Sequence, residues 1–220
     1  MEIRTDRPLP KHTKYDWEEC LAKVILENCI DSKYSKLQIK DKPDLQSEEL
    51  NIGVEVTVSV PQVDREIERL ASDISYNANA NKQYCIDRIK QLNGKYESKF
   101  GIVTHPTKSH SFKPILNAIN GKLKKINKGG YTEFKEMELY IRDDNLILEQ
   151  ELDMLYSMIE EIQNLYDRNF NKVFIYIPSY LITYTRNFKC KMININSSSA
   201  YNYSIKARDM VIEEEKRFTK

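Results

Sequence analysis

NIGVEVTVSV, residues 51–60, is the clearest strand pattern in the chain and decides its fold. Apolar, mostly β-branched side chains occupy every second position, as expected when one face of a strand is buried. The apolar face consists of Ile52, Val54, Val56, Val58 and Val60. The other face carries Gly53, Glu55, Thr57 and Ser59. This polar face is expected to be exposed, which makes Glu55 a candidate for chemistry at the surface of a sheet.

Helices and strands alternate on both sides of this strand. Upstream, Asp16 opens a helix whose apolar stripe runs to Cys29, and residues 35–40 alternate as a short strand. Downstream, we expect helices at 61–92 (with a weak point at 77–81), 112–128 and 146–166, strands at 134–142 and 173–177, and a short last helix at 205–217. Such alternation favours an α/β fold with helices flanking a central mixed sheet. Because no internal repeat or Pro/Ser-rich linker is present, residues 1–220 are expected to form a single domain.

The composition of the chain excludes several classes of protein. With 40% hydrophobic and 30% charged residues but only six Gly and seven Pro, it is neither collagen-like nor disordered. No apolar run approaches the roughly 18 residues of a membrane span, and the N-terminus lacks the apolar core of a secretory signal. The widely spaced cysteines suit a reducing cytoplasm better than a zinc ribbon or a disulfide scaffold: Cys20, Cys29, Cys85 and Cys190. We therefore expect a cytoplasmic protein without a membrane partner.

The net charge of +1 conceals three charge blocks. Residues 82–128 hold eleven Lys/Arg against two acids, a net of +9. Residues 133–167 hold eleven acids against two Lys/Arg, a net of −9, and residues 168–208 hold seven Lys/Arg and no acid, a net of +7. Segregated basic stretches are typical of proteins that bind a phosphate backbone. The alternative is that the blocks are solvated helix faces that neutralise one another in the fold.

A second carboxylate lies upstream of Glu55, where Pro43-Asp44 ends any helix. Asp44 stands eleven residues before Glu55, and the connection SEELN, residues 47–51, suits a hairpin between adjacent strands. Pairing of those strands would place the two carboxylates side by side, where they repel each other unless a cation lies between them. Hard oxygen ligands of this kind hold Mg²⁺ in proteins. Asp44 and Glu55 are therefore candidate ligands for Mg²⁺ or Mn²⁺.

This arrangement resembles the PD-(D/E)-x-K nuclease superfamily, whose fold is that of many restriction endonucleases. Pro43-Asp44 matches the first element of the motif and Glu55-Val56-Thr57 the second, and the resemblance covers about residues 16–76. It implies a restriction-endonuclease-like fold in which Asp44 and Glu55 bind a divalent ion, usually Mg²⁺, that activates water to attack a phosphodiester. It also implies an additional acidic residue on the first helix, for which the candidates are Glu18, Glu19 and Glu27.

The chain departs from the motif at its lysine. Thr57 occupies that position, and a hydroxyl group cannot stabilise the developing negative charge of a phosphorane as a cation can. A cation from elsewhere in the fold can replace the lysine, and the conceivable replacements are Lys122, Lys125, Arg65 and Lys82. The expected catalytic set is Asp44, Glu55, Thr57 and Lys122. The alternative is that catalysis has been lost and that a silent nuclease fold binds nucleic acid or a protein partner.

Nucleic acid, and DNA first of all, is the partner that this resemblance implies. The expected phosphate contacts lie in the basic helical segment 82–128 and in the aromatic and basic segment 168–208, at Lys122, Lys124, Lys125, Arg186 and Lys189. Aromatic side chains between residues 170 and 203 could stack on bases, although about half of such aromatics usually belong to a core. His105 and His110, near Lys108 in a loop, are further candidates for phosphate contacts.

The leading prediction is therefore a metal-dependent phosphodiester hydrolase acting on DNA, for which a homodimer is conceivable. A structural protein that self-associates through its charge blocks is the alternative from another class. An electrostatic surface without a basic region beside Asp44 and Glu55 would favour that alternative.

Overall fold

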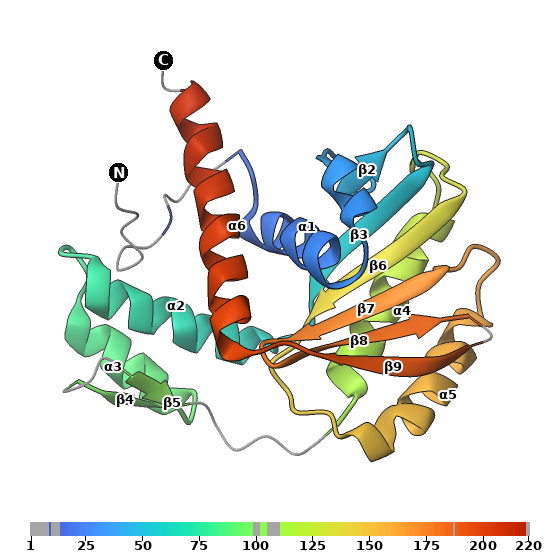
Figure 1. Ribbon diagram of the computed structural model, residues 1–220. Helices are drawn as coiled ribbons and strands as arrows, with labels where there is room; N and C mark the ends of the chain where they lie inside the picture. Colours follow the sequence, from blue (N-terminus) through green and yellow to red (C-terminus); the bar gives the residue numbers. More distant parts are fainter. Residues whose placement is uncertain (1–8, 10–13, 99–101, 105–110, 187, 219–220) are drawn as a thin grey trace. The chain divides into compact units, whose positions relative to one another are not determined.

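The structure, a computed structural model, describes residue 9 and residues 14–98, 102–104, 111–186 and 188–218 (Figure 1). Its described residues form two compact units. The larger unit combines Lys11–Ser59 with Phe112–Lys220, and the smaller unit contains Val60–Ser111. The smaller unit is thus an insertion in the sequence of the larger one.

The larger unit is built on a seven-stranded sheet with the order β1-β2-β3-β6-β7-β8-β9. The strands are β1 (Gln38–Ile39), β2 (Leu45–Ser47), β3 (Ile52–Val58), β6 (Glu136–Arg142), β7 (Lys172–Ile177), β8 (Tyr180–Thr185) and β9 (Phe188–Asn194). β3, β6 and β7 are parallel neighbours, whereas the pairs at both edges of the sheet are antiparallel. The predicted α/β fold with a central mixed sheet is confirmed.

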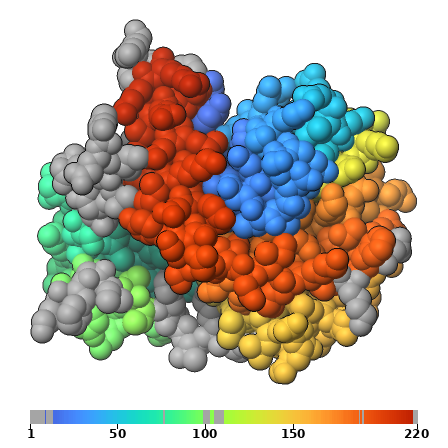
Figure 2. All heavy atoms as spheres, viewed as in Figure 1, coloured from blue at the N-terminus to red at the C-terminus, as the bar shows by residue number. Residues whose placement is uncertain are grey.

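Helices cover both faces of this sheet (Figure 1). The helices of the larger unit are α1 (Trp17–Cys29), α4 (Lys113–Asn127), α5 (Leu152–Gln163) and α6 (Ser197–Phe218), with short 3-10 helices η1 (Ser32–Lys36) and η2 (Glu149–Glu151). α4 and α5 lie on one face, and α1 lies on the other and packs against α6 (Figure 2). Asp16 begins α1, because its side chain accepts a hydrogen bond from the backbone N–H of Glu18 at 2.7 Å.

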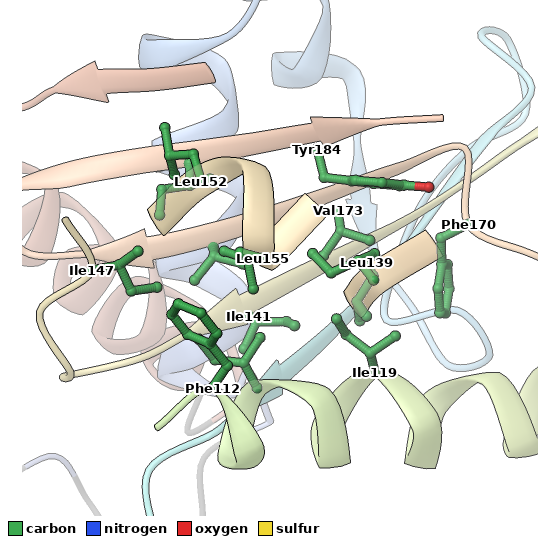
Figure 3. Close-up of a cluster of buried hydrophobic side chains, with 14 of the residues drawn as sticks. Phe112, Ile119, Leu139, Ile141, Ile147, Leu152, Leu155, Phe170, Val173 and Tyr184 are labelled. Atoms are coloured by element: carbon green, nitrogen blue, oxygen red, sulfur yellow. The ribbon is translucent and has the colours of Figure 1, made fainter. Parts of the chain in front are cut away.

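The main core lies between the sheet and the α4–α5 layer (Figure 3). The apolar stripe of α4 follows the spacing of helical turns and consists of Ile115, Ile119, Leu123 and Ile126, all buried. Alternate residues of three strands face these helices, among them Leu139, Ile141 and Val173. Burial of this stripe fixes the rotation of α4 about its axis, and with it the direction of the polar side chains beside the stripe.

The smaller unit contains α2 (Gln62–Tyr76), α3 (Lys82–Gln91) and a hairpin of β4 (Lys95–Glu97) and β5 (Ile102–Thr104). Its core is a small apolar cluster formed by Ile67, Leu70, Ile74, Cys85 and Ile89. The weak point expected within 61–92 is a break between two helices: α2 ends at Asn77, and the side chain of Asn81 caps α3 by accepting from the N–H of Tyr84 at 3.0 Å. Asparagine is common at helix ends because its side-chain amide can hydrogen-bond to backbone groups in place of the helical hydrogen bonds.

Several elements differ from the sequence prediction. Residues 35–40 are not one strand, because η1 takes residues 32–36 and leaves only the two-residue β1. The helix predicted at 146–166 begins only at Leu152, after η2, and the helix predicted at 205–217 extends over Ser197–Phe218. β8 and β9 were not predicted. Tyr180, Leu181 and Ile182 at the start of β8 are all buried and show no polar alternation, and a register shift interrupts the pattern of β9.

Candidate active site

A hairpin places the two predicted carboxylates together. β2 and β3 are antiparallel with Leu45 opposite Val54, so the next step along the ladder brings Asp44 beside Glu55. The Asp44 carboxylate accepts a hydrogen bond from the backbone N–H of Val56 at 2.7 Å, which holds it against β3. The strand pairing expected from the sequence is therefore present.

Gly53 permits the close approach of the chain that leads into Asp44. A Cβ atom on Gly53 would lie 2.6 Å from Cγ of Pro43 and 2.7 Å from the ring of Phe134, which is closer than real contacts allow. Gln46 secures the same segment by donating from Nε2 to the backbone oxygens of Asp41 at 3.0 Å and Pro43 at 2.8 Å. The glycine of the strand pattern thus helps to set the position of the first carboxylate.

Lys122 of α4 completes the cluster. Its ammonium donates to Glu55 Oε2 at 2.5 Å and to Asp44 Oδ2 at 3.1 Å. The lysine lies directly beside the buried stripe of α4, so the packing of Leu123 directs it toward β3. Of the other conceivable cations, Lys125 is exposed on α4, and Arg65 and Lys82 belong to the smaller unit. Among the four, Lys122 is the one that the larger unit brings to the carboxylates.

The polar face of β3 is not exposed, so that expectation was wrong. Glu55 is 1% exposed, because its strand position pairs with Leu139 of β6 and α4 covers this face of the sheet. Alternation in a sequence separates two faces of a strand but does not show that a helix packs on the polar one. Thr57, at the motif's lysine position, is half-buried.

The two oxygens of Glu55 have different surroundings. Oε2 accepts from Lys122 and, at 3.4 Å, from the hydroxyl of Tyr131. Oε1 is buried and has no hydrogen-bond partner among the described residues. A buried carboxylate oxygen without a partner is costly unless a cation or an ordered water satisfies it. Among the described residues of the cluster, this oxygen is the buried side-chain atom that lacks a hydrogen-bond partner.

Tyr131 is a residue of this site that sequence reasoning missed. It follows Gly129 and Gly130, which have φ angles of +87° and +82° and end α4 in a conformation that favours glycine. The Gly-Gly pair is a signal for the end of the helix. It does not show that the next aromatic side chain turns back to the strand.

Burial and charge act in opposite directions on the ionisable groups of the site. Burial raises the pKa of Glu55 above its ordinary value, against the opposing charge of Lys122. Burial lowers the pKa of Lys122, but the charges of Asp44 and Glu55 outweigh it, so this pKa lies above its ordinary value. Burial and the charge of Glu55 raise the pKa of Tyr131 to about 12. Lys122 therefore stays an ammonium and Tyr131 a neutral donor at neutral pH.

The structure separates the three acidic residues considered on α1. Burial, reinforced by the charge of Asp44, raises the pKa of Glu19 to about 7, and Lys122 opposes this shift, so Glu19 belongs electrostatically to the site. Glu18 instead accepts from Nε of Arg142 at 2.9 and 3.0 Å, and Glu27 pairs with Lys206 at 3.7 Å. Within the described ranges, no group of three or more His, Cys, Asp or Glu side chains forms a ready-made metal site.

The residues predicted to contact phosphates have several different settings. Lys124 and Lys125 are exposed on α4, and Arg186 is exposed with its guanidinium donating to Asn164 at 3.3 Å. Lys189 lies in β9, but its side chain is outside the described residues, as are His105, Lys108 and His110. Of the aromatics between 170 and 203, five are buried: Phe170, Phe174, Tyr176, Tyr180 and Tyr184. Phe188 and Tyr201 are exposed.

Comparison with protein-family models, with curated proteins and with solved structures found no match to this chain. In the part of the chain that the structure describes, no helix combines the length and the apolar character needed to cross a membrane.

Proposed function

We propose that the protein is a metal-dependent phosphodiester hydrolase acting on DNA, with a fold similar to that of restriction-endonuclease-like nucleases. The observation that carries the proposal is the convergence of three side chains from three elements. Asp44 precedes β2, Glu55 lies on β3, and Lys122 of α4 contacts both carboxylates. Two acids and one lysine are the residue types that the motif requires, with the lysine supplied by α4.

The charge of the cluster suits a divalent cation. Asp44, Glu55 and Lys122 carry a formal charge of −1 together, so a divalent cation would change it to +1. A cluster of that charge attracts a phosphodiester, which carries −1. Without such a cation, the remaining negative charge repels a phosphate group.

The ligand atoms present also fit Mg²⁺ or Mn²⁺. Asp44 and Glu55 would hold the ion, and the buried Oε1 of Glu55 lacks any hydrogen-bond partner among the described residues. Glu19 is the acid of α1 whose charge interacts with Asp44, so it supports the same site. When bound, the ion supplies Lewis acidity toward a phosphoryl oxygen and lowers the pKa of water.

Lys122 takes the role that Thr57 cannot fill. Its raised pKa keeps it cationic, so it acts as a hydrogen-bond donor to phosphoryl oxygens and not as a proton acceptor. Its side chain is 13% exposed, so it is not fully enclosed by the protein. The exposed Lys124 and Lys125 on the same helix would contact neighbouring phosphates of the DNA.

A plasmid-nicking assay tests the proposal. Supercoiled DNA is incubated with the wild-type protein in Mg²⁺, Mn²⁺ or EDTA, and with the variants Asp44→Asn, Glu55→Gln and Lys122→Met. We expect metal-dependent nicking by the wild type and at least about 100-fold less by each variant. Glu48→Gln is the matched control, because Glu48 lies in the β2–β3 turn with 80% of its side chain exposed and should keep full activity.

Two results would overturn the proposal. Nicking that persists in EDTA would exclude the metal dependence, and nicking by Glu55→Gln at the wild-type rate would exclude this site. DNA binding by a wild-type protein that never cleaves would instead support the silent nucleic-acid-binding alternative.

A further inference from the structure

We propose that a groove on the β7–β8–β9 part of the sheet binds an unpaired nucleotide of a nucleic-acid strand. The groove has a volume of about 320 Å³, which is within the size range of small-ligand sites. Its floor is formed by side chains of the three strands, and Cys29 and Ile30 at the end of α1 form one wall. It opens on the face of the sheet opposite α5, so it is separate from the cluster around Glu55.

A β-bulge turns an aromatic ring into this groove. Cys190 and Met192 of β9 pack on the core under α5, and regular alternation would direct Phe188 to that same side. However, Lys191 pairs with Thr183 whereas Phe188 pairs with Thr185, so the register shifts by one residue between them. Phe188 therefore shares the groove with Lys191, and bulges are known to redirect side chains next to functional sites.

The redirected ring is not used for packing. Phe188 is 66% exposed, although burial of its ring under α5 would have stabilised the core. An exposed phenyl ring beside a cation is a stacking surface for a nucleobase, and it accepts any base because every base has a π face. The phenyl ring of Phe188 thus gives the groove a surface on which one nucleobase can stack.

The cations of the groove match the phosphate of a nucleotide. Lys172 and Lys191 line the groove, and no acidic side chain does. Lys172 is held by Glu138 at 2.7 Å and Glu136 at 3.3 Å, which fixes its position at the floor. Lys191 is exposed and has no ion-pair partner among the described residues, so it is the cation available to a phosphate. Thr185 also lines the groove and its hydroxyl is a further hydrogen-bond donor, whereas the hydroxyl of Thr183 donates to the backbone oxygen of Lys191 at 3.5 Å.

The nucleotide must be unpaired and part of a strand. In a duplex both faces of a base are stacked, so no face remains for Phe188. A strand also carries neighbouring phosphates, and the exposed Arg186 follows β8 at the edge of this region. No acidic residue occurs between positions 168 and 208, and Glu136 and Glu138, the acids that contact Lys172 at the floor of the groove, are paired with that lysine.

Fluorescence anisotropy of a labelled twelve-nucleotide oligo-dT tests this site, in EDTA so that the Asp44–Glu55 site makes no metal-dependent contribution. We expect Phe188→Ala to weaken binding at least about fivefold. Lys191→Gln should reduce the slope of log affinity against log salt by about 0.7. Leu165→Ala and Lys36→Gln, which remove an exposed apolar side chain and an exposed cation outside the two segments expected to bind nucleic acid, are the matched controls and should bind as the wild type does.

Both groove variants alter exposed side chains, so their melting temperatures should equal that of the wild type. Oligonucleotide binding unaffected by Phe188→Ala would overturn the proposal. So would equal affinity for a duplex of the same length, or competition by free dTMP as strong as competition by the oligonucleotide. Glu55→Gln should leave this binding intact, so a failure of the groove and a failure of the proposed hydrolase are distinguishable.

Discussion

Two buried glutamates on neighbouring strands have opposite environments. Glu55 of β3 faces α4, whereas Glu138 of β6, beside Val54 in the ladder, points to the other face of the sheet. Both are almost fully buried, at 1% and 0% exposure, and both contact a lysine. We call the first group, Asp44, Glu55, Lys122 and Tyr131, the Glu55 cluster. The second group, Tyr34, Glu136, Glu138 and Lys172, is the Glu138 cluster.

The difference lies in how completely each carboxylate is satisfied. The hydroxyl of Tyr34 lies 3.0 and 2.9 Å from the two oxygens of Glu138 and shares its one proton between them, and Lys172 donates to Oε1 at 2.7 Å. In the Glu55 cluster, Oε2 of Glu55 accepts hydrogen bonds from both Lys122 and Tyr131. Oε1 of Glu55 has no partner among the described residues. A fully bonded buried charge supports the fold, whereas an incompletely bonded one beside a second carboxylate retains capacity for a ligand.

The largest expected effect is on stability in the Glu138 cluster. Glu138→Ala would leave the Tyr34 hydroxyl buried without its acceptor and Lys172 with only Glu136. We expect the free energy of unfolding to fall by about 3 kcal/mol, as when one partner of a buried ion pair is removed. Urea denaturation measures this change. Glu55→Gln is the companion variant, and its free energy of unfolding should fall by less. A loss of free energy in Glu55→Gln as large as that in Glu138→Ala would show that the two clusters do not differ in this respect.

The second prediction tests what positions the Glu55 cluster. Gly53→Ala would force Pro43 and Phe134 away from β3, because the new Cβ would lie within 2.7 Å of both. Overpacking of this kind should lower the free energy of unfolding by about 2 kcal/mol and should also reduce nicking, since Asp44 follows Pro43.

Gly121→Ala on α4 is the matched control for this change. No atom lies within 4 Å of a Cβ added there, and alanine favours helix, so stability should rise by about 0.5–1 kcal/mol. Equal responses to the two substitutions would show that the close approach at Gly53 does not matter.

A third, smaller effect concerns added metal. Melting curves with and without millimolar Mn²⁺ should show stabilisation of the wild type by about 1–2 kcal/mol, because an ion bound only by the folded state shifts the folding equilibrium. Asp44→Asn and Glu55→Gln should lose most of this gain, whereas Glu138→Gln should keep it. The same gain in all four proteins would place any bound ion outside the Glu55 cluster.

The smallest expected effect is the pH dependence of the Glu138 cluster. Burial raises the pKa of Glu138 above its ordinary 4.5, against the charge of Lys172. The folded state therefore binds this proton more tightly than the unfolded state, and stability falls as the pH rises from about 4.5 toward the raised pKa. Glu138→Gln should lack this decline. Urea denaturation of the wild type and of Glu138→Gln between pH 4 and pH 8 measures this difference. If the free energies of unfolding of the two proteins change with pH in the same way, the raised pKa of Glu138 is contradicted.

The sequence predicts some parts of these clusters and not others. The period-two pattern of residues 51–60 predicts β3, and the distance from Asp44 to Glu55 predicts their pairing, because both depend on local geometry. Lys122 was predicted in the catalytic set, but nothing in the sequence separates it from Lys125, Arg65 and Lys82, since that choice depends on how α4 packs. The burial of Glu55 was mispredicted for the same reason.

Other features leave too weak a signal in the sequence. Glu138 lies in FKEMELYIR, a stretch with four charged residues in which nothing marks one of them as buried. The boundary of the smaller unit at Val60 is marked only by Pro61, and the Pro and Ser residues around the boundary at Ser111 (Pro106, Ser109, Ser111 and Pro114) were not interpreted as a linker. The bulge of β9 arises from its pairing with β8, which a single strand sequence does not specify.

The insertion between β3 and α4 also bears on how the protein folds. Ile52 pairs with Glu136 across 84 positions of sequence, whereas the smaller unit forms its contacts within residues 60–111. The entropy of closing so long a loop must be lost before the parallel pairing of β3 with β6 can stabilise anything, and rates fall as contacts become more distant in sequence. Pairing of these two strands is thus expected to form late. The side chains of Glu55 and Lys122, on either side of the insertion, then come together among the last contacts of the chain.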